Sequence, residues 1–162
     1  MARLTASLAG GTNVLAFLDM LAWLEGTDHP RQPTKDQCYD VILGGASFTG
    51  YADHLRRLVD LPRLGIKSTA AGRYQLLSRY WDSYRKSLKL EGGFPPENQD
   101  RVAIQQIRER RALADIKAGR IPHAINKCWS IWASLPGAGY GQNEHSLDDL
   151  LAHYVAVGGR LA

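Results

Sequence analysis

Apolar residues recur at helical spacing from Val14 to Leu24, and this run ends at the pair Glu25-Gly26. The spacing predicts an amphipathic helix with Asn13 as its N-cap and Gly26 as its stop. The residues on the apolar face are Val14, Phe17, Leu18, Leu21 and Ala22. The run is shorter than the roughly 20 residues of a membrane span and Asp19 interrupts it, so an integral membrane protein is not expected.

Most of the remaining chain also has helical periodicity. Further helices are predicted over residues 74–91 and 98–112, from Pro122, and from Ser146 to Gly158. The helix from Pro122 is expected to bury Ile125, Cys128, Trp129 and Trp132. Two β-prone runs, 38–43 and 46–51, flank Gly44-Gly45 and predict a hairpin.

These elements predict an α+β fold, mostly helical with one small antiparallel sheet. Residues 1–12 are small and polar, which favours a flexible N-terminal segment, and residues 13–162 then form a single domain. A chain of this size buries about two-thirds of its unfolded surface, so it needs no disulfide or metal to stabilise it. Cys38 and Cys128 are accordingly expected to be reduced, partly buried thiols.

The charge is concentrated in the middle of the chain. Residues 61–127 carry a net charge of +8, whereas residues 1–60 and 128–162 each carry −2. A region this basic favours a polyanionic partner such as nucleic acid or the anionic cell wall, and a solvated helix surface is the alternative. No nucleic-acid-binding motif is present, so nucleic acid is not an expected partner. The five His residues lack ligand spacing, so neither a metal nor a cofactor is expected.

Glu25 is the first candidate catalytic residue. At 100° per residue it lies within roughly 20° of the apolar face of the first helix. Partial burial and the negative end of the helix dipole both disfavour its charged form, so both raise its pKa toward that of a general acid. The alternative is a Glu at the rim of the core whose carboxylate reaches water.

Four segments occur in the order typical of one family. They are AFLDMLAWLEGTDHPRQ, YDVILGG, KSTAAGRYQLLSRYWDSYRK and IWASLPGAGYGQNEH. Over about residues 14–160 the chain resembles the lambda-type phage endolysins, which are small lytic transglycosylases that cut peptidoglycan. The resemblance implies a lysozyme-like fold with a substrate cleft, and it implies that Glu25 is the catalytic acid.

The resemblance also implies a set of substrate-binding residues. Gly72, Tyr74 and Gln75 belong to GRYQ, which resembles the Gly-x-x-Gln segment whose Gln hydrogen-bonds substrate. Tyr140 resembles the Tyr that these enzymes place over the scissile sugar. Ser68 and the neighbouring Thr69 are candidates for binding acetamido groups, although Ser68 is equally suited to capping an element. Segments 57–67 and 134–145 would form the lips of the cleft.

The small number of carboxylates favours a transglycosylase over a hydrolase. Hydrolysis requires a second carboxylate, whereas a transglycosylase needs one because the C6 hydroxyl of the muramic acid replaces water. One muramidase pattern has Asp nine residues after Glu and Thr six further on, but Thr34 and Asp40 occupy those positions here. The alternatives are a muramidase with Asp40 or Asp28 as second carboxylate, and a non-catalytic wall-binding module.

No secretory signal sequence is recognisable in these residues. The expected location is therefore the host cytoplasm before lysis, with action on peptidoglycan in the periplasm after release. The family implies that a membrane-permeabilising holin provides that release. The expected partners are peptidoglycan glycan strands, and the expected oligomeric state is a monomer.

Overall fold

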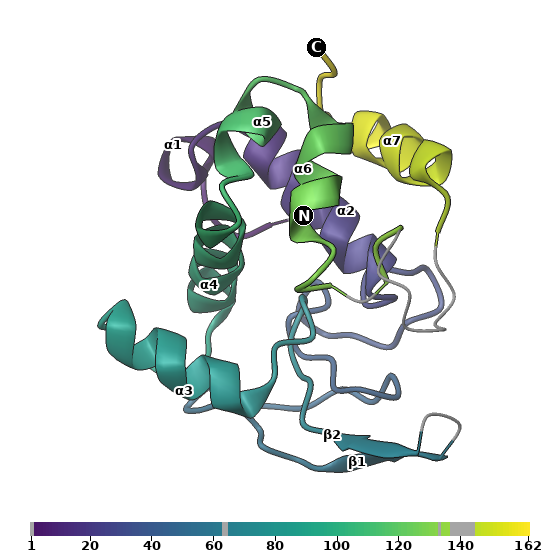
Figure 1. The fold of residues 1–162 in the computed structure, drawn as a ribbon. Helices are drawn as coiled ribbons and strands as arrows, with labels where there is room; N and C mark the ends of the chain where they lie inside the picture. The colour runs from purple at the N-terminus through teal and green to yellow at the C-terminus, as the bar shows by residue number, and fades with distance from the viewer. Residues whose placement is uncertain (1, 63–64, 133, 137–144) are drawn as a thin grey trace.

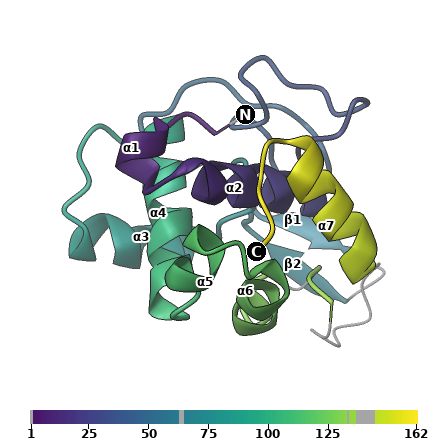
Figure 2. The same ribbon diagram turned by 90° about the horizontal axis from the view of Figure 1, so that it is seen from above.

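A long buried helix lies at the centre of the molecule. The computed structural model describes residues 2–62, 65–132, 134–136 and 145–162. The central helix, α2 (Thr12–Leu24), contacts α1 (Ala6–Ala9), α5 (Leu113–Lys117) and α7 (Leu147–Ala156). It crosses the middle of the molecule in both views (Figures 1 and 2). Its central residues are fully buried because neighbours cover it on several sides, and these residues are Phe17, Leu18, Met20 and Leu21.

The N-terminal segment differs from its expected flexibility. The Thr5 side chain caps α1, and the backbone N–H groups of Arg3 and Leu4 both donate to Asp100 at 2.8 Å. These contacts hold the segment against the core in place of a frayed end. The predicted cap is also wrong, because Gly11 precedes α2 as its N-cap. Asn13 instead bonds to carbonyl groups at residues 116, 117 and 160.

The small sheet lies later in the chain than predicted. Strands β1 (Val59–Leu61) and β2 (Ile66–Ser68) pair antiparallel, with Val59 opposite Ser68. The predicted hairpin over residues 38–51 consists of a tight turn with one antiparallel bridge, Val41 to Ser47. Across the turn, the Ile42 N–H donates to the Ala46 carbonyl and the Phe48 N–H donates to the Asp40 carbonyl, whereas residues 41 and 43 bond to residues 70–72 on the other edge. The hairpin is therefore present but short.

The later helices are close to their predicted positions. They are α3 (Ser78–Ser87), α4 (Pro96–Glu109), α6 (Ile121–Cys128) and α7. The helix predicted over residues 98–112 is divided, because Arg111 has a φ of 56° and separates α4 from α5. Trp129 is 39% exposed because α6 ends before it, which makes the prediction of its burial wrong. The predicted cap of α7 is confirmed: the Ser146 side chain accepts from the Asp149 N–H.

Two hydrophobic clusters divide the fold into two parts. The larger cluster surrounds α2, and a smaller one lies around Trp81 and Phe94. Figure 1 shows the sheet and α3 on the lower side and most helices above them. The α+β fold class predicted from the sequence is confirmed. Among the described residues, no helix is both long and apolar enough to cross a membrane.

Candidate active site

A cavity of about 430 Å³ opens between these two parts. Glu25, at the end of α2, lies on its wall together with residues from the sheet and from the chain after α6. The principal polar and aromatic residues around it are Ser68, Tyr74, Gln75, Trp132 and Ser134. The other wall is formed by α3 and α4. The cavity is therefore bordered by segments that are far apart in sequence.

Glu25 occupies the C-terminal cap of α2, where its backbone N–H donates to the Leu21 carbonyl at 2.9 Å. The chain then reverses at Gly26, whose φ of 71° suits glycine. The Oε1 atom of Glu25 is buried and has no hydrogen-bond partner among the described residues. Burial raises the pKa of Glu25 to about 7, although a hydrogen bond with the Ser134 side chain acts to lower it.

A buried arginine ties the chain after Glu25 to the GRYQ segment. The Arg73 guanidinium is fully buried, donates to Asp19 at 3.0 Å and also pairs with Asp28. The Thr27 hydroxyl donates to the Arg73 carbonyl at 2.6 Å. Because a buried guanidinium needs such partners, these contacts hold the turn after Glu25 in one position relative to the cavity wall.

The GRYQ segment, residues 72–75, forms part of the cavity wall near Glu25. Gly72 has a φ of 80°, and a Cβ there would lie 2.2 Å from the Gln99 side-chain oxygen, so glycine is required. Tyr74 directs its hydroxyl away from the cavity and donates to Asp100 at 2.6 Å. The Gln75 amide donates to the Gly72 carbonyl at 2.9 Å, which orients the side chain at the wall.

The structure thus brings together most of the candidate residues. Ser68, Tyr74 and Gln75 line the same cavity as Glu25, whereas Gly72 shapes the turn behind it. The Thr69 hydroxyl caps α3 by accepting from the Ser78 N–H, which gives it a structural contact. Tyr140 lies outside the described residues.

Sequence reasoning did not select several cavity residues, chiefly Ser134, Tyr80, Tyr84, Gln106 and Arg110. A signal existed for Gln106, because it lies at a buried position of an apolar helix face. Ser134 falls within a predicted lip, but no spacing rule connects it with Glu25. The two Tyr residues fit a packed helix face equally well.

The other acidic candidates lie away from this cavity. Asp28 pairs with Arg73, and Asp40 accepts from the Thr34 hydroxyl and from the Lys35 N–H. Neither lines the cavity, so Glu25 is the one carboxyl group on its wall among the residues described. Both thiols, Cys38 and Cys128, are free and buried. Within the described ranges, no group of three His, Cys, Asp or Glu side chains could hold a metal ion.

A helical domain with a small sheet and a buried carboxyl group in the intervening cavity defines a lysozyme-like protein, and the comparisons agree. The Endolysin family profile matches residues 15–161. The endolysin of Escherichia phage lambda is 61% identical over 145 residues, which cover 89% of this chain and 90% of that protein. The endolysin of Escherichia phage P2 is 54% identical over 157 residues, covering 91% and 93%.

Solved structures show the same relationship. Lambda lysozyme in complex with a chitohexasaccharide superimposes with a TM-score of 0.89 at 54% identity, over the full length of both chains. A second structure of lambda lysozyme gives a TM-score of 0.86 at 53% identity, again over both full chains. The chain belongs to the endolysin family, and its function is the lysis of cell walls by cleavage of peptidoglycan.

Proposed function

We propose that this endolysin is a lytic transglycosylase that uses Glu25 as its catalytic acid and base. One observation carries the proposal: among the described residues, Glu25 is the single carboxyl group on the cavity wall, and burial raises its pKa to about 7. A group with this pKa donates and recovers a proton near neutral pH. It needs no second carboxylate if no water molecule has to be activated.

The reaction proceeds in two proton transfers. Protonated Glu25 gives its proton to the glycosidic oxygen between N-acetylmuramic acid and N-acetylglucosamine as the bond to the muramic C1 breaks. The C6 hydroxyl of the same muramic acid attacks C1 and returns its proton to the Glu25 carboxylate. The product ends in 1,6-anhydromuramic acid, and no water is consumed. The substrate's N-acetyl group assists the oxocarbenium-like intermediate.

Two features of the site support this mechanism, and the first favours it over hydrolysis. Asp28 and Asp40 are occupied by partners outside the cavity, so neither is placed to activate water. Ser134 contacts Glu25 and lowers its pKa, which stabilises the carboxylate that forms after the first transfer. Burial still dominates, so the acid form persists near neutral pH.

The remaining cavity residues bind the glycan in this proposal. Ser68 and Gln75 provide polar contacts to acetamido and hydroxyl groups, and Tyr74 provides an apolar wall while its hydroxyl remains bonded to Asp100. Tyr140 is proposed to cover the scissile sugar. The related lambda lysozyme has been crystallised with a chitohexasaccharide, which supports glycan binding by this fold. Release to the wall by a holin completes the proposal.

Mass spectrometry of the products tests the mechanism. Purified peptidoglycan is digested with the wild-type protein, with Glu25→Gln and with Glu91→Gln as a control at an exposed carboxyl group. We expect anhydromuropeptides from the wild type and the control and none from Glu25→Gln. Products heavier by one water would refute the transglycosylase mechanism, and near-wild-type activity of Glu25→Gln would refute the role of Glu25.

A further inference from the structure

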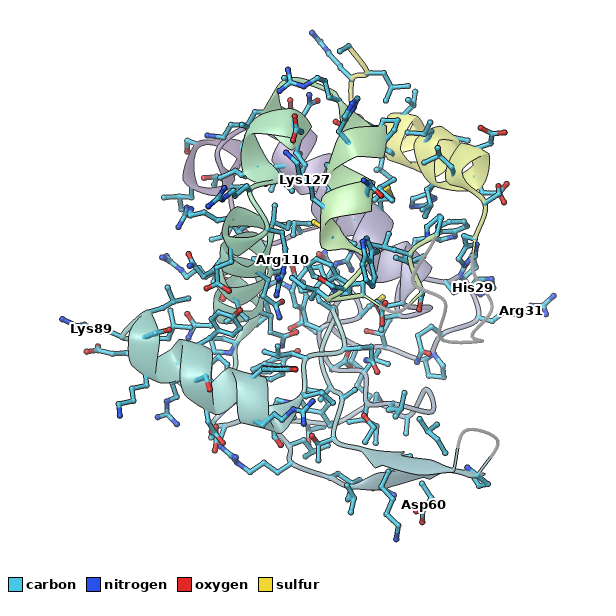
Figure 3. All side chains as sticks on the ribbon, viewed as in Figure 1. His29, Arg31, Asp60, Lys89, Arg110 and Lys127 are labelled. Carbon is cyan, nitrogen blue, oxygen red and sulfur yellow. The ribbon has the colours of Figure 1, made fainter. Side chains whose placement is uncertain are left out.

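The wall of the cavity made by α3 and α4 carries polar groups that the proton transfers do not use. Gln106 and Arg110 lie four residues apart at the end of α4, so they share one face of the helix. Both line the cavity beside Tyr80 and Tyr84 of α3. Figure 3 labels Arg110 between α4 and α6, on the side of α4 that faces the middle of the molecule. A ligand in the cavity can therefore reach this charge.

A second feature of this wall is the charge of the Arg110 guanidinium. Among the described residues, no carboxylate forms an ion pair with it. The adjacent Glu109 uses its two oxygens to accept from the Tyr84 hydroxyl at 2.6 Å and from the Gln105 amide at 3.0 Å. By contrast, Arg108 on the same helix donates to Gln105 at 2.9 Å. Arg110 thus retains its donors for a ligand.

Gln106 adds a second polar group at the same place. The residue is only 7% exposed, yet its side chain borders the cavity. The buried side-chain atoms that lack a partner among the described residues do not include the Gln106 amide, and no hydrogen bond among those residues uses it, so the amide is open to the cavity. A ligand that enters the cavity can supply the partner. The guanidinium and the amide together offer donors that match a carboxylate and its neighbouring peptide group.

We propose that Arg110, assisted by Gln106, binds a carboxylate carried by the muramic acid of the substrate, and so selects peptidoglycan over neutral glycans. This inference rests on the proposed function, because it assumes a peptidoglycan strand in the cavity. The carboxylate has two sources: the peptide attached to the lactyl group, or the lactyl group itself where the peptide has been removed. Chitin oligosaccharides carry neither.

Binding measurements in the Glu25→Gln background, which keeps the strands intact, test the inference. Three probes are compared: peptide-bearing glycan strands, amidase-treated strands that keep only the lactyl carboxylate, and chitohexaose. The variants are Arg110→Gln, Arg110→Lys and Arg108→Gln, the last removing the same charge from α4 outside the cavity. With active enzyme, KM on peptidoglycan is expected to rise about tenfold in Arg110→Gln and kcat to stay within twofold.

We expect Arg110→Gln to weaken binding of one or both anionic strands about tenfold and to leave chitohexaose unchanged. Arg110→Lys should recover part of the loss, because it keeps the charge without the planar fork. A loss on peptide-bearing strands alone assigns the peptide carboxylate, and a loss on amidase-treated strands alone assigns the lactyl carboxylate. A loss on both strands shows that Arg110 binds either carboxylate. Equal effects on all three probes, or none, would overturn the inference.

The two proposals fail in distinguishable ways. Wild-type protein that releases anhydromuropeptides while Arg110→Gln behaves like Arg108→Gln would overturn the inference alone. Wild-type protein that releases hydrated products would overturn the mechanism, yet the ratio of dissociation constants would still report on Arg110. Absence of both binding and cleavage by the wild type would overturn the two together.

Discussion

Replacing Glu25 with Gln should make the protein more resistant to unfolding as the pH rises. The pKa of Glu25 is about 7 in the folded protein, against an ordinary value of 4.5. Between these values the folded state holds a proton that the unfolded chain has released. Raising the pH through this range therefore favours unfolding of the wild type. The amide introduced by Glu25→Gln has no proton to lose in this range, so the variant lacks this penalty.

The size of the effect follows from the two pKa values. One pKa unit corresponds to about 1.4 kcal/mol, so the full penalty is about 3 kcal/mol above pH 8. Between pH 5 and pH 8 the free energy of unfolding of the wild type should fall, relative to that of Glu25→Gln, by about 2 to 3 kcal/mol. The carboxyl group is buried, so screening by solvent does not reduce this difference.

Urea denaturation at pH 5, 6.5 and 8 measures this difference. Fluorescence reports unfolding because Trp81 and Trp132 are buried. Subtracting the free energies of unfolding of the two proteins at each pH removes the contribution of the other titrating groups. A pH-independent cost of placing an amide at this position is the same at every pH, so it does not affect the change between pH 5 and pH 8. Glu91→Gln removes an exposed carboxyl group and should follow the wild type. A difference between wild type and Glu25→Gln that stays constant from pH 5 to pH 8 would refute the burial argument.

Two further substitutions test the surroundings of Glu25. Ser134→Ala removes the hydrogen bond that lowers the pKa of Glu25, so the pKa should rise. The alkaline limb of the pH–activity profile should then move to higher pH, and a limb that stays or moves to lower pH would contradict this. Gly72→Ala places a Cβ 2.2 Å from a Gln99 oxygen at a φ of 80°, and urea denaturation should show a loss of about 2–3 kcal/mol. Gly44→Ala, also at positive φ but with open space, is its control and should lose less.

The sequence predicted the parts of the fold that depend on local pattern. The period from Val14 to Leu24 gave α2 nearly to the residue, and Ser146 with Asp149 gave the start of α7. These signals are local, because a helix face and a capping box each need only a few neighbouring residues. The cap at Asn13 failed because distant carbonyl groups bind its side chain, and no local rule contains them.

The position of the small sheet could not be predicted from local pattern either. Residues 38–51 have the composition of a hairpin and form a short one with a single bridge, but residues 41–43 also pair with residues 70–72 across a long sequence separation. Strands β1 and β2 have only three residues each and begin within residues 57–67, the segment that was expected to form a lip of the cleft. Pairing over such distances is decided by packing of the whole domain, so the composition of one segment does not reveal it.

In the site, too, local pattern predicted some residues and not those whose position depends on distant parts of the chain. Helical phase alone brought Glu25 to the apolar face, and the structure buries its Oε1 atom. Resemblance supplied Ser68, Tyr74 and Gln75, whose common position depends on how the chain returns to the cavity. Arg110 was predicted by neither route. An exposed basic residue on a helix looks like a solvated surface, and only the cavity distinguishes it from its neighbours.

The burial that suits Glu25 to the proposed role of catalytic acid also costs stability at neutral pH. A carboxyl group in water would ionise well below pH 7 and would be a poor acid, whereas in this cavity the proton remains until about pH 7. The Arg73 contacts support that burial, because they tie the turn after Glu25 to the GRYQ segment through Thr27 and Asp28. Variants that loosen this connection should therefore lower the pKa of Glu25 toward its ordinary value as they admit water. The raised pKa of Glu25 and the loss of stability at neutral pH thus both follow from the burial of this turn.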